Sequence, residues 1–139
     1  ALHKEFGEVR VNGVIKNVID AQYRQIGRAF FDGITGTATE KISAAIEMFS
    51  EPKLGTNDAP IEVKELKRTE TEYDFNITRC DYAKLYQDLG VPELGALLVC
   101  GVDHPMTEGY NAGVQLDRAQ TIMLGADYCP FRYKVNPKD

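Results

Sequence analysis

Three cysteines, Cys80, Cys100 and Cys129, are the side chains of this sequence best suited to nucleophilic chemistry. Cys80 is expected to end a strand and begin a helix, where free backbone N–H groups and the helix dipole favour a thiolate. Cys100 is expected near a helix C-terminus, where the dipole disfavours a thiolate, and Cys129 at the start of the last strand. Cys80 is therefore the preferred nucleophile. The alternative for each of the three is a small, buried and inert apolar side chain.

A stretch with several glycines and a proline, residues 101–113, carries further candidates for proton transfer and binding. Asp103 follows an expected helix and is either a general base or a turn residue. His104 and Tyr110 lie in the same stretch and are candidates for substrate binding. Zinc bound by the three thiols and His104 is a further alternative, but the spacing of these residues resembles no common zinc finger or ribbon. We therefore expect no metal and no cofactor.

Two arginines are candidates for holding an anionic substrate. Arg79 is adjacent to Cys80, although neighbouring residues of a strand point to opposite faces. Arg118 lies in an expected strand, among residues that should face inward. A buried arginine needs an anionic partner, and we expect Asp117, Asp74 or a substrate carboxylate in that role.

The overall composition narrows the classes of function. The 139 residues carry a formal net charge of −5, and the densest basic stretch, residues 64–68, is interrupted by Glu65. Nucleic-acid binding is therefore not expected. No apolar run approaches the roughly 20 residues that span a bilayer, so no membrane interaction is expected either. Three cysteines without a CxxC pair favour a reducing compartment, so we expect a cytoplasmic protein, and the sequence leaves a homo-oligomer open.

The elements that must position these side chains begin with two helices. Apolar residues recur at helical spacing from residue 14 to about 31, after an interruption at Asn12 and Gly13. Gly27 lies inside this helix and weakens it. Thr37 and Glu40 have the capping-box spacing, so a second helix is expected from there to about residue 50.

A change of period after Pro60 indicates the first pair of strands. In the second of them, Tyr73, Phe75, Ile77 and Arg79 alternate with other residues, which predicts an aromatic face toward the helices. The opposite face carries Asp74, Asn76, Thr78 and Cys80. That face is unusually polar, and either water or a ligand covers it.

Two short helices are expected next, over residues 80–89 and 93–100, with Pro92 opening the second. The irregular stretch 101–113 follows, and two strands, 115–124 and 128–135, end the chain. This order predicts an α+β fold in which N-terminal helices pack on a four-stranded antiparallel sheet, with two short helices between the strand pairs. We expect a single domain over residues 1–139, with helices at about 14–50 and the sheet and inserted helices at about 61–136.

Several separated runs of residues together form a family pattern. They are residues 75–80 (FNITRC), 89–94 (LGVPEL), 100–103 (CGVD) and 125–132 (GADYCPFR), with Arg118, Thr121 and Ile122. The pattern resembles the L-2-amino-thiazoline-4-carboxylic acid hydrolase family, and the preceding helices fit the layout of that family. Pro130 departs from it, because an Asp is more usual at that position. The ending also resembles, more distantly, the small-molecule-binding 4-vinyl reductase domain.

The resemblance implies a hydrolase that opens a C–N or C–S bond of a carboxylate-bearing heterocycle, 2-aminothiazoline-4-carboxylate, to give N-carbamoyl cysteine. Cys80 would attack the ring or position the attacking water, and Asp103 would move the proton. Arg79 or Arg118 would pair with the carboxylate. The other candidates would line the pocket or assist: Cys100, Cys129, His104 and Tyr110. The resemblance to the 4-vinyl reductase domain implies the alternative, a non-catalytic domain that binds or senses a small molecule.

Overall fold

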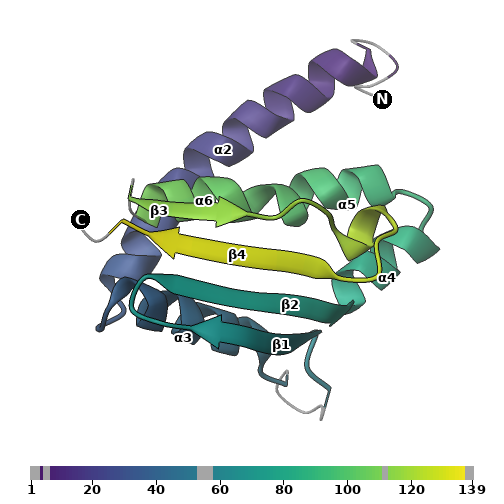
Figure 1. The fold of residues 1–139 in the computed structure, drawn as a ribbon. Helices are drawn as coiled ribbons and strands as arrows, with labels where there is room; N and C mark the ends of the chain where they lie inside the picture. Colours follow the sequence, from purple (N-terminus) through teal and green to yellow (C-terminus); the bar gives the residue numbers. More distant parts are fainter. Residues whose placement is uncertain (1–3, 5–6, 53–57, 111–112, 137–139) are drawn as a thin grey trace.

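The chain folds into two layers, with helices covering one face of a four-stranded antiparallel sheet (Figure 1). The computed structural model describes residues 4, 7–52, 58–110 and 113–136. The helices are α2 (Glu8–Asp32), α3 (Ala38–Ser50), α4 (Asp81–Asp88), α5 (Pro92–Leu98) and α6 (Asp103–Tyr110), with the 3₁₀ helices η1 (Cys100–Val102) and η2 (Ile122–Leu124). The strands are β1 (Ile61–Arg68), β2 (Glu72–Cys80), β3 (Val114–Asp117) and β4 (Cys129–Val135). The predicted α+β class is confirmed, including short helices between the strand pairs.

The strands lie in the order β1-β2-β4-β3, so the last strand enters between the second and the third. Strands β2 and β4 pair with Phe75 opposite Phe131 and with Tyr73 opposite Tyr133. These four buried rings share the face toward the helices, where Phe75 and Phe131 stack with their centroids 4.9 Å apart. Burial of each ring stabilises the fold by roughly 1.5–3 kcal/mol. The predicted aromatic face of this strand is confirmed.

A bulge in β2 changes which of its last residues face the helices. Val63 pairs with Ile77 and the preceding Glu62 pairs with Arg79, so Thr78 is the extra residue of the bulge. As a result Cys80 turns inward and packs against the core, although strict alternation predicted it on the polar face. Arg79, predicted on the helix side, instead binds acceptors at the end of the sheet. The prediction was wrong because one extra residue reverses the faces of all that follow.

The first helix is longer than predicted. It begins at Glu8, and neither Asn12 nor Gly13 interrupts it. Gly13 is exposed, and nothing lies within 4 Å of the point where its Cβ would be. A glycine at such a position costs only about 1 kcal/mol relative to alanine. A helix of 25 residues tolerates that cost.

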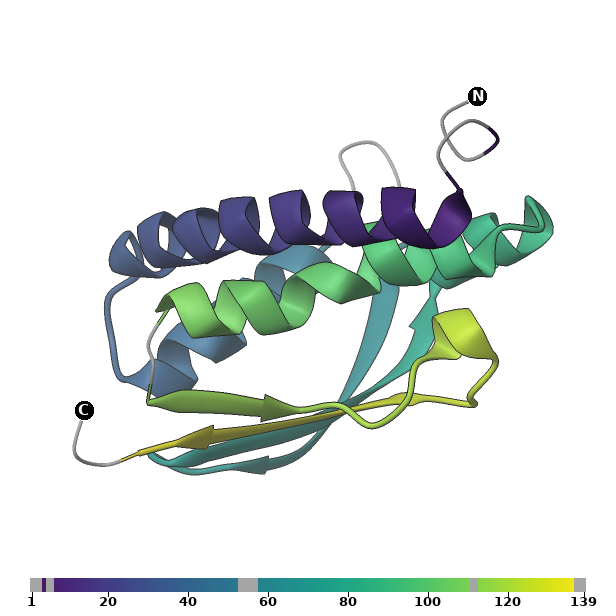
Figure 2. The same cartoon turned by 90° about the horizontal axis from the view of Figure 1, so that it is seen from above.

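Gly27 was predicted to weaken this helix, but it allows a second helix to pack closely against it. Helices α2 and α6 lie side by side, and Figure 2 shows α6 between α2 and the sheet. A Cβ on Gly27 would lie 2.1 Å from the carbonyl O of Met106, and one on Gly109 would lie 1.9 Å from that of Arg24. The two helices therefore touch backbone to backbone. This contact fixes the position of α6 over the sheet.

The stretch 101–113, predicted to be irregular, is largely helical, because it forms η1 and α6. Residues 111–112 of it lie outside the described residues. Pro105 lies in the first turn of α6, where a proline is tolerated, and Gly109 serves the contact with α2. Proline and glycine suggested a loop, but both are compatible with this helix.

The predicted strand 115–124 is much shorter than expected. Strand β3 ends at Asp117, and the chain then leaves the sheet to form η2, where the Thr121 side chain accepts a hydrogen bond from the Leu124 N–H. The other predicted elements are confirmed to within two residues at each end: the helices α4 and α5 and the strand β4. The capping box of Thr37 and Glu40 at the start of α3 is also confirmed.

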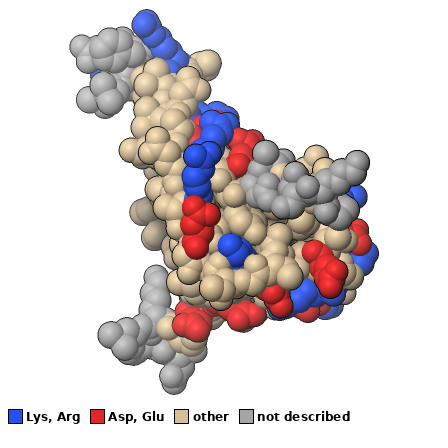
Figure 3. All heavy atoms as spheres, turned by 90° about the vertical axis from the view of Figure 1, so that its left-hand side faces the viewer, with Lys and Arg blue, Asp and Glu red and all other residues tan. Residues whose placement is uncertain are grey.

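Charged side chains of both signs are interspersed over the face of the molecule shown in Figure 3. Within the described part of the chain, no helix combines the length and the hydropathy required to cross a bilayer. The longest helix, α2, has 25 residues and carries charged side chains along its length.

Candidate functional site

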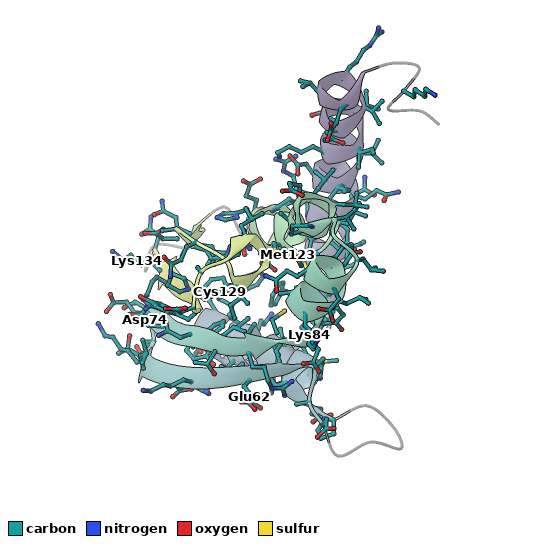
Figure 4. The ribbon with its side chains drawn as sticks, turned by 90° about the vertical axis from the view of Figure 1, so that its right-hand side faces the viewer. Glu62, Asp74, Lys84, Met123, Cys129 and Lys134 are labelled. Atoms are coloured by element: carbon teal, nitrogen blue, oxygen red, sulfur yellow. The ribbon has the colours of Figure 1, made fainter. Side chains whose placement is uncertain are left out.

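The three cysteines gather at the end of the sheet where β2 ends and β4 begins. Cys80 is the last residue of β2, Cys129 is the first of β4, and Cys100 opens η1. A negative charge on Cys80 or on Cys129 raises the pKa of Cys100, so the three sulfur atoms share one electrostatic environment. Figure 4 shows Cys129 on the helix side of the sheet, with Asp74 and Lys134 on the outer side. Folding thus brings together residues that are far apart in the sequence.

Cys80 occupies the N-cap position of α4, as the sequence predicted. Its Sγ accepts a hydrogen bond from the Ala83 N–H at 3.4 Å, and the Tyr82 N–H also contributes. Burial nevertheless outweighs these donors, so the pKa of the Cys80 thiol is raised above its ordinary value of 9.0. The expectation of a favoured thiolate is therefore wrong for the unliganded protein. The two donors offset part of the effect of burial on the charged form of this sulfur.

The other two thiols are also protonated at neutral pH. Burial raises the pKa of Cys100 to about 12, even though the nearby positive charge of Arg118 lowers it. Burial likewise raises the pKa of Cys129, whose Sγ accepts a hydrogen bond from the Ile122 N–H at 3.2 Å. Both side chains therefore have the properties of small apolar groups that line the site.

Asp103, the first residue of α6, lies beside the thiols. Its carboxylate forms an ion pair with Arg118. Burial raises the pKa of this carboxyl to about 6, because the cost of desolvating the charged form exceeds the stabilisation by Arg118. A surface fraction of 30% of the Asp103 side chain still reaches solvent. Asp103 is thus a partly buried carboxyl that changes its charge close to neutral pH.

Arg118 is the first residue beyond β3, and its side chain is only 11% exposed. Its Nη1 donates hydrogen bonds to Asp103 and to the carbonyl O of Cys100, the latter at 2.8 Å. The guanidinium also lies over the ring of Phe131, 5.7 Å from its centroid. The sequence predicted a buried arginine with an anionic partner. Its protein partner is Asp103 and neither Asp117 nor Asp74, and the third alternative, a substrate carboxylate, stays a prediction.

Two of the predicted binding residues lie apart from this group. All three nitrogens of the Arg79 guanidinium donate hydrogen bonds, to Glu62, to Asp81 and to the carbonyl O of Ala59. Tyr110 is seven residues beyond Asp103 on α6, roughly 10 Å along the helix axis. Its ring packs on that of Phe31, with the centroids 4.2 Å apart.

His104 lies at the margin of the site. It lines a surface cavity of about 400 Å³ between α6 and β3, together with Thr107, Val114 and Leu116 among others. Burial lowers the pKa of His104, and the positive charge of Arg118 lowers it further. The histidine is thus within electrostatic reach of Arg118 and lines this surface cavity. At neutral pH it is therefore uncharged.

Two residues that the sequence did not indicate, Thr107 and Tyr133, lie close to Asp103. The Thr107 hydroxyl donates to the carbonyl O of Asp103 at 2.7 Å, and the buried Tyr133 hydrogen-bonds to Thr107. Burial and the charge of Asp103 both raise the pKa of Tyr133, which shows that the phenol lies near the carboxyl. The four-residue spacing of Thr107 and Asp103 would have suggested this contact only if the stretch had been recognised as a helix.

Among the residues that the structure describes, no three His, Cys, Asp or Glu side chains are arranged to hold a metal ion. The group that does come together consists of Cys80, Cys100, Cys129, Asp103 and Arg118. It combines a potential nucleophile, a base that titrates near neutral pH, and a cation, all in largely desolvated surroundings. Such a group is suited to proton transfer and to attack on an electrophilic carbon.

A comparison with protein families places this group in a known context. The family model of L-2-amino-thiazoline-4-carboxylic acid hydrolase matches residues 1–133, which include all five clustered residues. No curated protein matches the chain. The match extends over nearly the whole length, from α2 to β4, and the chain therefore belongs to the L-2-amino-thiazoline-4-carboxylic acid hydrolase family.

Proposed function

We propose that this protein hydrolyses a carboxylate-bearing heterocycle such as 2-aminothiazoline-4-carboxylate, with Cys80 as nucleophile and Asp103 as general base. Membership of the hydrolase family supports the reaction class. The observation that carries the proposal is the pKa of Asp103, about 6, in a carboxyl that lies among three thiols and an arginine. A carboxyl with that pKa is mostly ionised at neutral pH and is a stronger base than an ordinary carboxylate, which favours general-base catalysis.

The reaction begins with attack on C2, the ring carbon bonded to both nitrogen and sulfur. A bond from Cys80 Sγ to C2 forms, the C2–S bond of the ring breaks, and the substrate sulfur leaves as a thiol after accepting a proton. Water then attacks the same carbon and displaces Cys80. The product is N-carbamoyl cysteine, so one water is consumed and the enzyme returns to its starting state.

We propose Cys80 as the nucleophile, in place of a directly attacking water, because a thiol is a stronger acid than water. Burial raises the pKa of the Cys80 thiol, but a thiol still gives its proton to a carboxylate more readily than water does. Asp103 therefore ionises the thiol far more easily, and the proton that it gains goes to the leaving sulfur.

The remaining residues of the group bind and orient the substrate. Arg118 holds the carboxylate, since the Arg79 guanidinium is occupied at the end of the sheet. Cys100 and Cys129 line the site as uncharged thiols. Tyr82 and Ala83 donate backbone hydrogen bonds to the sulfur of Cys80.

The test is formation of N-carbamoyl cysteine from 2-aminothiazoline-4-carboxylate, followed by mass spectrometry. Cys80→Ser and Asp103→Asn are each expected to lower kcat/KM by at least 100-fold, because each removes one partner of the proton transfer. Asp88→Asn, which alters an exposed carboxylate on α4, is the matched control and should keep full activity. Full activity in both site variants would contradict the mechanism.

One observation favours a second candidate, a non-catalytic domain that binds small molecules. All three thiols have raised pKa values and are therefore unreactive in the unliganded protein. A binding domain predicts that the wild-type protein forms no product and that ligand affinity is unchanged in Cys80→Ser. The product assay together with a binding measurement on that variant separates the two functions.

A further inference from the structure

One donor of the Arg118 guanidinium, Nε, is left without a hydrogen-bond partner by the described residues. The hydrogen bonds of the guanidinium to Asp103 and to the Cys100 carbonyl both come from one nitrogen, Nη1. Its Nε is buried and has no hydrogen-bond partner among the described residues. A buried donor of a charged group that stays unpaired destabilises the folded protein. This nitrogen marks a place where an acceptor from outside the protein would be stabilised.

The chemistry around Nε defines the acceptor that fits. Nε and Nη2 form one edge of a guanidinium, and the two parallel N–H bonds of that edge match the two oxygens of a carboxylate. The ring of Phe131 lies under the guanidinium, and the uncharged thiol of Cys100 lies beside it. A small, flat carboxylate with an apolar or sulfur-containing body suits these surroundings.

We propose that Arg118 holds two carboxylates at once, Asp103 on Nη1 and a small carboxylate ligand on the Nε–Nη2 edge, so that ligand binding and protonation of Asp103 are linked. The inference rests on the proposed function only for the identity of the ligand. The carboxylate that would orient the substrate thereby also controls the proton that the reaction uses.

The direction of the linkage follows from the charges near Asp103. Arg118 supplies the positive charge that opposes the effect of burial on this carboxyl. The other titratable groups that face Asp103 or Arg118 are uncharged at neutral pH, namely Cys80, Cys100, Cys129, Tyr133 and His104. A second anion on Arg118 offsets its charge, so ligand binding raises the pKa of Asp103 and takes up protons. By reciprocity, the ligand binds more tightly when Asp103 is protonated.

The probe for this linkage is thiazole-4-carboxylate, an aromatic analogue that is not opened by hydrolysis and stays ionised between pH 5.5 and 8. Titration calorimetry in two buffers of unlike ionisation enthalpy measures the protons taken up on binding. We expect net proton uptake near pH 6.5 and an affinity about sevenfold higher at pH 5.5 than at pH 8, which corresponds to a rise of one pKa unit in Asp103.

Three variants assign the effect to its residues. Asp103→Asn should bind the probe with an affinity independent of pH, because no proton remains to be exchanged. Arg118→Lys keeps the charge but lacks the two-donor edge, so the affinity should fall at least 30-fold. Arg24→Lys is the matched control, since this exposed arginine on α2 pairs with Glu108 away from the thiols, and its affinity should equal that of the wild type.

Equal affinity of the wild type at pH 5.5 and pH 8, or full affinity in Arg118→Lys, would overturn the inference. If Arg118→Lys does not fold, ¹³C NMR titration of the Asp103 carboxyl in the wild type decides the matter, since its pKa must rise when the probe is bound. The hydrolase proposal fails differently, through absence of N-carbamoyl cysteine, and that outcome leaves binding of the probe and its pH dependence intact.

Discussion

At Asp103, burial and the charge of Arg118 act on the same carboxyl in opposite directions, and burial prevails. At Cys80 the same competition sets two backbone donors against burial, and burial prevails again. Both groups are thus in their protonated forms more often than in water. Under the proposed mechanism, the proton of Cys80 moves to Asp103 when the substrate is bound.

This balance predicts the pH dependence of the reaction. Only the ionised Asp103 accepts a proton, so kcat/KM should rise with pH and level off above an apparent pKa of about 6. The pH range over which kcat rises should be higher than that for kcat/KM, because a bound carboxylate offsets the charge of Arg118. Steady-state rates between pH 5 and pH 8 measure both limbs. Profiles that are flat over this range would contradict the role of Asp103, and Asp88→Asn should reproduce the wild-type curves.

Among the elements, the contact between α2 and α6 positions Asp103, because α6 begins with that residue. The contact depends on Gly27 and Gly109, at which a Cβ would overlap a backbone carbonyl of the facing helix. Backbone atoms cannot move aside as the end of a flexible side chain can. A side chain at either position therefore forces the helices apart.

Gly27→Ala is expected to lower the free energy of unfolding by about 3 kcal/mol, as overpacking does elsewhere. Gly13→Ala is the matched control in the same helix, because its Cβ would enter open space, and it should raise stability by about 1 kcal/mol. Urea denaturation of both variants measures the difference. Equal stability of the two variants would show that the helices are not in backbone contact.

The same elements show what a sequence can and cannot predict. Local signals were sufficient for the capping box at Thr37, for the aromatic face of β2 and for the α+β order. They failed at Thr78, where one extra residue reverses the strand faces, and at Gly109, which looks like a loop residue until its partner helix is known. The pairing of Arg118 with Asp103 joins segments 15 residues apart through tertiary packing, and no local pattern contains it.

At the scale of the whole molecule, the sheet separates two unlike surfaces. The thiols, Asp103 and Arg118 lie on the helix side, whereas the outer side is polar and carries a shallow cavity of about 490 Å³ lined by Asp74, Arg132 and Lys134 among others. The sequence left open whether water or a ligand covers that outer side. We propose that the substrate binds on the helix side.

A double variant on the outer side tests this placement. Asp74→Asn with Lys134→Gln removes two charges from the cavity without touching the helix side (Figure 4). Exposed substitutions of this kind change stability by less than about 0.5 kcal/mol. We expect kcat/KM for 2-aminothiazoline-4-carboxylate to stay within twofold of the wild type. A loss of tenfold or more would move the substrate to the outer face.

We propose that Cys80 attacks the ring carbon with Asp103 as its base. Mass spectrometry of protein quenched with acid during turnover tests it most directly. The account predicts that the peptide containing Cys80 gains the mass of one substrate molecule, and that Asp103→Asn gains it at least 100-fold more slowly. Turnover without any adduct on Cys80, with undiminished activity in Cys80→Ser, would contradict it.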